Sequence, residues 1–270
     1  MTTYLGVSGW PVAHSRSPQM QNAALAAAGL ADWRYIRLPL PPELFAETVR
    51  ALPALGFRGI NVTIPHKEAA LALADSASDA ARAIGAANTL IFEEEGGIVA
   101  ENTDSPGLLA ALPAGWEPAG RTALVLGAGG AARAAVHALL AAGAADVAVW
   151  NRTPERAARL AADLGARAVD RPEPAQIVVN CTSIGLHDPD ATFKALPLEA
   201  DSWGTGSLVV DMVYRDGGTR LLAAARTRGA SVVDGLEILI AQGAASFERW
   251  TGRTAPRQAM REAVSQIATT

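Results

Sequence analysis

The sequence has little of what disulfide-bonded, membrane-spanning or secreted proteins require. Cys181 is the single cysteine among 270 residues, so an internal disulfide is excluded and a reducing compartment is favoured. No segment approaches the ~20 uninterrupted apolar residues that a membrane-spanning helix needs. The first residues, MTTYLGVSGWP, have neither a basic start nor a long apolar stretch, which predicts no secretory signal. We therefore expect a soluble, cytoplasmic protein with no membrane partner.

Positive charge and metal-ligand patterns are also scarce. The 23 lysines and arginines are outnumbered by 27 acidic residues and form no basic run, which argues against a nucleic-acid partner. The four histidines have no metal-ligand spacing and no cysteine pair beside them, so we expect no metal site; they are His14, His66, His137 and His187. With 50% hydrophobic and 19% charged residues, the chain has the composition of a well-packed protein of one large or two modest domains.

Strand-like runs alternate with alanine-rich helical stretches, which predicts an α/β fold with a largely parallel sheet. One stretch differs, because NTLIFEEEGGIVAEN predicts a β-hairpin that turns at residues 94–97. The Pro/Gly-rich segment 112–121 then precedes a new strand, TALVL, and we expect a domain junction near it. Further strands are expected at DVAVW, QIVVN, SLVVDMVY and ASVVDG, followed by helices at roughly 236–250 and 256–268.

A glycine-rich loop follows the strand TALVL. Gly127, Gly129 and Ala132 have the spacing G-x-G-x-x-A, and a predicted helix then ends at Gly143. The first glycine permits a tight turn, the second lets the backbone approach a pyrophosphate, and the small third residue lets the helix pack on the strand. The pyrophosphate would meet free N–H groups at the positive end of the helix dipole. The alternative is an ordinary strand-to-helix turn, but the flanking strands and helix favour nucleotide binding.

The next strand, DVAVW, ends in Asn151, Arg152 and Thr153. A carboxylate at this position would accept hydrogen bonds from a free ribose 2′-hydroxyl, whereas an arginine suits a 2′-phosphate. The sequence therefore favours NADP over NAD, although a simple surface arginine is the alternative. Arg156, one turn further on, fits equally well as a second phosphate ligand and as a solvated helix residue.

Polar residues also follow the strands of the N-terminal half. Ser15 and Ser17 lie between a strand and a helix, where they fit either as helix caps or as ligands of a small carboxylate. Thr63 follows another strand, and Lys67 comes in the first turn of the next helix. An ammonium there is disfavoured by the helix dipole by ~0.3–1 kcal/mol, so stability does not explain it.

Asn88 and Asp104 lie at the ends of further strands. Asp104 fits either as the N-cap of the helix SPGLLAAL or as a functional carboxylate. His66, beside Lys67, is expected to face elsewhere, and Cys181 is expected to pack beneath the glycine loop as a small hydrophobic residue.

Taken in order, several motifs resemble the shikimate dehydrogenase family, the NADP-dependent enzymes of aromatic amino-acid biosynthesis. They are GWPVAHSRSP, NVTIPHK, IGAANT, NTDSPG, GAGGAARA, NRTPER, VNCTSIG, DMVY and DGLEILIAQGAASFERWTG, and they span nearly the whole chain. The resemblance implies an α/β fold with two domains. A discontinuous N-terminal substrate domain would comprise residues 1–104 and 237–270, and a Rossmann-type, parallel-sheet cofactor domain would comprise 105–236. The active site would lie in the cleft between them.

The resemblance also implies residue roles. Lys67 and Asp104 would be the catalytic pair. The substrate carboxylate and ring hydroxyls would be bound by Ser15, Ser17, Thr63, Lys67, Asn88, Asp104, Tyr214 and Gln242. NADP would be bound by Gly127, Ala128, Gly129, Gly130, Ala131, Asn151, Arg152, Thr153, Arg156, Thr182, Ser183, Met212, Gly235 and Ile238. Three positions depart from residues that are frequent in the family, namely Trp10, Gln21 and Ile238, and the last concerns how the nicotinamide face is packed.

The implied reaction is the reversible, NADPH-dependent reduction of 3-dehydroshikimate to shikimate. Such a ketone reduction needs a hydride on one face and a proton for the developing alkoxide, and Lys67 would supply that proton. A quinate or aminoshikimate dehydrogenase is the nearest alternative, and a non-catalytic sensor of NADP or a metabolite is a second. The presence of Lys67, Asp104 and Gln242 together argues against the sensor, because a protein that only binds a metabolite needs no proton donor. The oligomeric state stays open, with a homodimer as one option.

Overall fold

The computed structural model describes residues 2–198 and 203–265, which form two compact units. The first contains residues 1–107 and 239–270, and the second contains residues 108–238. The chain passes between the units within two helices, α5 (Asp104–Ala111) and α10 (Gly235–Thr251). The junction was expected near residues 112–121, and the division between Gly107 and Leu108 lies a few residues before that segment. The reason is that α5 continues into the second unit, where Leu108 is fully buried in the core.

The first unit carries a six-stranded sheet. Its strands are β1 (Thr3–Gly9), β2 (Trp33–Pro39), β3 (Phe57–Val62), β4 (Ser76–Ala77), β5 (Thr89–Phe92) and β6 (Ile98–Glu101). Its helices, besides parts of α5 and α10, are α1 (Ser17–Ala27), α2 (Pro42–Ala51), η1 (Pro53–Leu55), α3 (Lys67–Leu73), α4 (Asp79–Ile84) and α11 (Arg257–Ser265). Residues 266–268, expected at the end of the last helix, lie outside the described residues.

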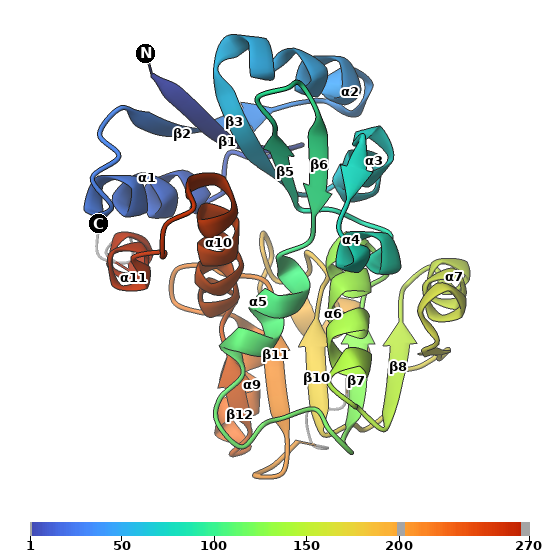
Figure 1. Cartoon of the computed structure of the whole chain (residues 1–270). Helices are drawn as coiled ribbons and strands as arrows, with labels where there is room; N and C mark the ends of the chain where they lie inside the picture. Colours follow the sequence, from blue (N-terminus) through green and yellow to red (C-terminus); the bar gives the residue numbers. More distant parts are fainter. Residues whose placement is uncertain (1, 199–202, 266–270) are drawn as a thin grey trace. The chain divides into compact units, whose positions relative to one another are not determined.

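The strand order in this sheet is β2-β1-β3-β5-β6-β4, and the pairing is mixed (Figure 1). β1 is parallel to β2 and β3, whereas β5 is antiparallel to both β3 and β6. The predicted hairpin is confirmed as β5 and β6, and it makes the sheet less parallel than expected. As a result, Asn61 near the end of β3 lies opposite Thr89 at the start of β5, and Thr89 lies opposite Glu101 at the end of β6. The ends of β3 and β6 therefore meet the start of β5 at one edge.

Apolar side chains cover the first sheet on both faces. On one face Phe45 and Val49 of α2 pack with Ile60 of β3 in a buried cluster. On the other, the Trp250 indole of α10 donates a hydrogen bond to the Leu90 carbonyl at 3.0 Å. A side chain at position 59 of β3 would collide with that indole, so the glycine there lets the helix pack closely against the sheet.

The second unit is a doubly wound parallel sheet, as expected for a Rossmann-type domain. Its strands are β7 (Thr122–Leu126), β8 (Asp146–Trp150), β9 (Arg167–Ala168), β10 (Ile177–Asn180), β11 (Leu208–Asp211) and β12 (Ser231–Val233). The helices are α6 (Gly130–Ala141), α7 (Pro154–Leu164), α8 (Thr192–Ala195) and α9 (Arg220–Thr227). The order β12-β11-β10-β7-β8-β9 reverses direction between β7 and β10, which is the point where such sheets bind ligands.

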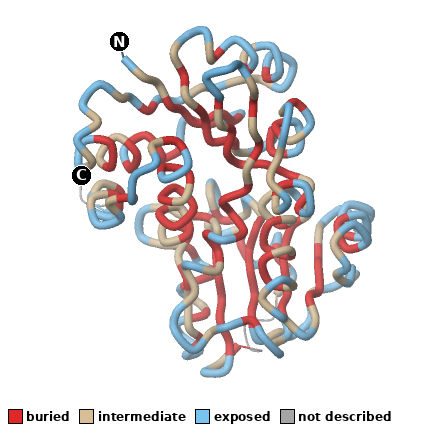
Figure 2. The backbone as a smooth tube through the Cα atoms, viewed as in Figure 1, coloured by how far each residue is buried: buried red, intermediate tan, exposed pale blue. Residues whose placement is uncertain are grey.

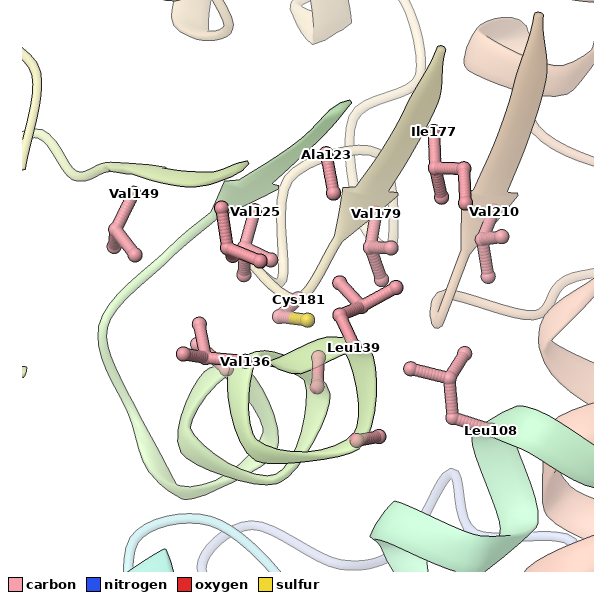
Figure 3. Packing of buried hydrophobic residues seen from close by; sticks show 14 of the residues in the cluster. Leu108, Ala123, Val125, Val136, Leu139, Val149, Ile177, Val179, Cys181 and Val210 are labelled. Atoms are coloured by element: carbon pink, nitrogen blue, oxygen red, sulfur yellow. The ribbon is translucent and has the colours of Figure 1, made fainter. Parts of the chain in front are cut away.

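Burial on both faces explains the uninterrupted apolar strands of this unit (Figure 2). In β7, Val125 belongs to one buried cluster and its neighbour Leu124 to another, because successive side chains point to opposite faces. Figure 3 shows Val136 and Leu139 of α6 facing the strand residues of the first cluster. Within the described residues, no helix is long and apolar enough to cross a membrane.

One carboxylate, that of Asp211, is buried at the end of β11. Its Oδ1 accepts hydrogen bonds from the side-chain amide of Asn180 at 2.9 Å and from the backbone N–H of Val213 at 3.1 Å. Burial disfavours the charged form more than these hydrogen bonds favour it, and the nearby Asp234 adds repulsion. The pKa of Asp211 is consequently raised from 3.8 to about 6.

We expect this raised pKa to reduce stability as the pH rises from about 4 to about 6. Over that range the folded protein keeps the proton on Asp211 while the unfolded chain releases it. The free energy of unfolding should therefore fall by up to about 3 kcal/mol from this group. Asp211→Asn keeps the side-chain shape and cannot ionise. Denaturant unfolding at several pH values should show the variant gaining stability relative to wild type across this range, and a constant difference would contradict the assignment.

Candidate functional site

The mixed sheet of the first unit brings the expected polar residues to one edge. Because β1 and β3 are parallel, the turns that follow them, with Ser15 and Lys67, leave the sheet at the same side. The antiparallel hairpin adds Asn88, just before β5, and Asp104, just after β6. Gln242 comes from α10 and lies within hydrogen-bond distance of Asn88.

Lys67 and Asp104 form a buried ion pair at this edge. Lys67 Nζ donates to Asp104 Oδ2 at 2.5 Å, and each residue is 9% exposed. The lysine begins α3, where its charge opposes the helix dipole, and the carboxylate compensates for that placement. The pair thus holds an ammonium group in a position largely shielded from water.

The alternative role of Asp104 as a helix cap is wrong, because Asn102 provides the cap. The side-chain oxygen of Asn102 accepts hydrogen bonds from the backbone N–H groups of Asp104 at 3.1 Å and Ser105 at 3.2 Å. The Asp104 carboxylate is therefore left for the site, and its second oxygen, Oδ1, accepts from Asn88 Nδ2 at 2.8 Å. Sequence reasoning missed Asn102, although an asparagine two residues before a helix start is a common capping signal.

Asn88 and Gln242 complete the hydrogen-bonded group around the ion pair. Asn88 Nδ2 lies 3.3 Å from Gln242 Oε1, and Gln242 Nε2 donates to the Leu239 carbonyl at 2.9 Å. Lys67, Asp104, Asn88 and Gln242 are therefore joined by direct hydrogen bonds.

Thr63 lies outside this hydrogen-bonded group. It is half-buried just after β3, and its backbone N–H donates to the Ser8 carbonyl at 2.8 Å. Its hydroxyl makes no hydrogen bond to the group within the described residues, so its expected role in substrate binding stays a prediction.

Neither of the two serines occupies the N-cap position of α1. Arg16 occupies the N-cap position without a side-chain cap bond, and Ser15 Oγ accepts only a long hydrogen bond, at 3.3 Å, from the Ser17 backbone N–H. Both serines are buried, and the Ser17 hydroxyl makes no hydrogen bond within the described part of the chain. Their hydroxyl protons are thus available to a ligand such as a carboxylate.

His66 faces away from the ion pair, as expected. Its Nε2 lies 2.7 Å from the Leu40 carbonyl, and its ring stacks on Phe45 of α2 with centroids 4.3 Å apart. Burial lowers its pKa, so the ring is a neutral packing residue at physiological pH.

In the second unit, the glycine loop leaves the start of α6 without a side-chain cap. Gly127 has a φ of +109°, and a Cβ there would lie 3.3 Å from the Cys181 backbone carbonyl. Gly129 is the N-cap of α6 and has no side chain to satisfy the first N–H groups, and the space beside it is open. Of the other expected residues, Ala128 lies in the loop before Gly129, and Gly130 and Ala131 lie in the first turn of α6. Cys181 packs in the core below the loop, which confirms its expected role.

Two arginines that follow β8, Arg152 in the turn and Arg156 in α7, have no partner in the described part of the protein. Asn151 Nδ2 donates to the Thr153 carbonyl at 2.9 Å, which fixes the turn. Arg152 and Arg156 are exposed, and neither side chain makes a hydrogen bond or ion pair with any described residue. Two unpaired guanidinium groups at the ribose edge fit a 2′-phosphate.

The remaining expected cofactor residues lie after β10, β11 and β12. The backbone N–H and hydroxyl of Thr182 both bond to the side-chain oxygen of Asn180, while Ser183 is exposed. Sequence reasoning missed Asn180, which positions Thr182. Gly235 packs on the backbone of Met212, where a Cβ would lie 2.7 Å from the carbonyl oxygen.

Two further expected residues, Ile238 and Tyr214, also belong to the second unit. Ile238 is buried in the core of this unit, and Tyr214 is half-buried. The expected role of Tyr214 as a substrate ligand stays a prediction.

Comparisons with known proteins agree along the chain. Residues 7–90 match the shikimate dehydrogenase substrate binding domain, residues 112–181 match shikimate / quinate 5-dehydrogenase, and residues 235–264 match the shikimate 5′-dehydrogenase C-terminal domain. The shikimate dehydrogenase (NADP(+)) of Paracoccus denitrificans is 47% identical over 259 residues, which cover 92% of this chain and 90% of that protein.

Two solved structures are also similar. The shikimate 5-dehydrogenase of Thermus thermophilus, in complex with NADP(H) and shikimate, has a TM-score of 0.88 and 43% identity, with 98% of this chain and 99% of that chain covered. The ligand-free 5-ketofructose reductase of Gluconobacter sp. strain CHM43 has a TM-score of 0.86 and 34% identity, with 99% of each chain covered. By the extent and identity of these matches, the chain belongs to the shikimate dehydrogenase family.

Proposed function

We propose that this protein catalyses the reversible, NADP-dependent reduction of 3-dehydroshikimate to shikimate. The observation that carries the proposal is the buried ion pair between Lys67 and Asp104, held at a sheet edge in a chain of this family. A protein that only senses a metabolite has no need of a proton donor whose burial must be compensated by a second charge. Location in the cytoplasm and assembly as a homodimer stay predictions.

In this proposal each polar group of the first unit has a task. Lys67 Nζ would donate a proton to the carbonyl oxygen as it becomes an alkoxide, and would take it back in the oxidation. Asp104 holds the ammonium in place through Oδ2. Ser15 and Ser17 would bind the substrate carboxylate through hydroxyl protons that the protein leaves available. NADP, when bound, exchanges the hydride, and the glycine loop with residues 151–153 would hold it.

The test is an assay of NADPH and NADH formation with shikimate and quinate in parallel. We expect kcat/KM to be highest for shikimate with NADP. A clear preference for quinate would identify the protein as the related quinate enzyme. No turnover with either substrate would refute the proposal. The similarity to a 5-ketofructose reductase makes a sugar ketone the next substrate to examine.

Replacing the proposed proton donor should slow turnover without weakening cofactor binding. We expect Lys67→Ala to lower kcat by roughly 10²–10⁴-fold, the usual contribution of a positioned general acid. Lys67→Arg should restore little, because a guanidinium scarcely releases a proton at neutral pH. Thermal unfolding must be measured beside the kinetics, since leaving Asp104 unpaired costs about 3–5 kcal/mol. Near-normal turnover in a folded variant would assign the proton to another group.

The unpaired arginine after β8 should determine the choice of cofactor. Loss of a charge-assisted phosphate contact in Arg152→Ala should cost NADP about 1.5–3 kcal/mol and leave NAD nearly unaffected. The ratio of kcat/KM for NADP to that for NAD should then fall by about one to two decades. Arg152→Asp should abolish or invert the preference, because a carboxylate repels the phosphate and accepts hydrogen bonds from a free ribose.

Arg226→Ala provides a matched control for net charge, because Arg226 is also exposed but lies on α9. We expect its cofactor ratio to equal that of wild type. If the control moves the ratio as far as Arg152→Ala, or if wild type already prefers NAD, Arg152 is a surface charge without a role in selection.

A further inference from the structure

Three buried hydroxyls lie close together beside Asn88. The hydroxyl oxygens of Thr89, Thr103 and Ser246 form a triangle, with 2.9 Å between Thr89 and Ser246, 3.0 Å between Thr103 and Ser246, and 3.3 Å between Thr89 and Thr103. None of the three residues is more than 2% exposed. They come from β5, from the turn before α5 and from α10, so this hydroxyl triangle joins three segments of the chain.

Two side-chain amides donate into the hydroxyl triangle. Asn61 Nδ2 donates to Ser246 at 2.9 Å and to Thr89 at 3.1 Å, and Asn88 Nδ2 donates to Thr103 at 2.9 Å. Because the hydroxyl oxygens accept these N–H groups, their own protons must find other acceptors. Asn88 Oδ1 is such an acceptor for two of them, since it lies 3.2 Å from the hydroxyls of both Thr89 and Thr103. The Ser246 hydroxyl has an acceptor in the Gln242 carbonyl at 3.1 Å.

This arrangement of donors determines which end of the Asn88 amide faces the ion pair. The backbone N–H of Thr103 also donates to Asn88 Oδ1, at 2.7 Å. With Oδ1 held by these donors, Nδ2 is left to donate to Asp104 Oδ1 at 2.8 Å. The reverse orientation would place an amide oxygen against the carboxylate and an amide N–H against the backbone N–H, which loses hydrogen bonds and adds repulsion.

We propose, resting on the function proposed above, that the hydroxyl triangle orients Asn88 and thereby holds Asp104 toward Lys67 for proton transfer. Thr89 and Ser246 are then positioning residues for the reaction, although neither is expected to touch the substrate. Their effect passes through Asn88, which has Asp104 on one side and the triangle on the other. A purely structural role would instead depend on how well their side chains fill space.

Thr89 allows these two roles to be separated with a matched pair of variants. Thr89→Val removes the hydroxyl and keeps the side-chain shape, whereas Thr89→Ser keeps the hydroxyl and removes a methyl group. We expect Thr89→Val to lower kcat for shikimate oxidation about 3- to 10-fold, the scale of one hydrogen bond, with KM for NADP unchanged. Thr89→Ser should stay within about twofold of wild type, because it keeps the hydrogen bonds.

A double-mutant cycle tests whether the effect passes through Asn88. Ser246→Ala should lower kcat about 3- to 10-fold alone and should have no further effect in an Asn88→Ala background. Ser8→Ala is the control, because Ser8 is fully buried in β1 and its hydroxyl has no partner among the described residues. We expect its kcat to be unchanged.

Three results would overturn this positioning role while leaving the proposed function intact. One is a Thr89→Ser variant as slow as Thr89→Val in an otherwise active enzyme. Another is an equal loss from Ser246→Ala in both backgrounds, and the third is wild-type kcat in Thr89→Val and Ser246→Ala. If either Thr89→Val or Ser246→Ala fails to fold, the kcat of the other variant is sufficient to test the proposal. A wild-type protein without activity on shikimate would instead refute the function, and this role with it.

Discussion

The ion pair between Lys67 and Asp104 is the interaction on which the site in the first unit depends. Taking two charges out of water costs several kcal/mol per ion, and only close contact with further hydrogen bonds recovers it. Asp104 meets this condition because Lys67 bonds to one of its oxygens and Asn88 to the other. Since the three residues come from α3, α5 and the turn before β5, the pair is stable only when these segments meet. The same contacts that bring these segments together therefore also form the site.

The mixed pairing of the first sheet is what allows those segments to meet. In a purely parallel sheet, each strand end is followed by a crossover, and polar residues reach the site only from carboxyl ends. Here the hairpin of β5 and β6 places an amino end and a carboxyl end beside the end of β3. Asn88 and Asp104, separated by only 16 positions, thus lie on adjacent strand ends and bond directly.

Most of this arrangement follows from local sequence patterns, and the exceptions have physical causes. The alternation of strands and helices, the hairpin and the glycine loop were predictable because each depends on neighbouring residues. The junction within α5 was not, because a helix that continues from one unit into the next has no change in composition to mark it. Asn102 and Asp104 both suit a helix cap, and only the tertiary structure decides between them. Ser246 is a small residue in a helix, and its contacts with Thr89 and Thr103 are long-range.

The two units use strand ends in opposite ways, and the difference follows from the ligand group each would hold. A substrate with a carboxylate and hydroxyls is recognised by side chains, so the first unit places serine, lysine, asparagine and aspartate beside its strand ends. A pyrophosphate is recognised by backbone N–H groups, so the second unit needs small residues there, such as Gly127 and Gly129, to let the backbone approach. Only beyond the pyrophosphate, at the ribose, would a side chain become useful, and the residue proposed for that role is Arg152, two residues after the end of β8.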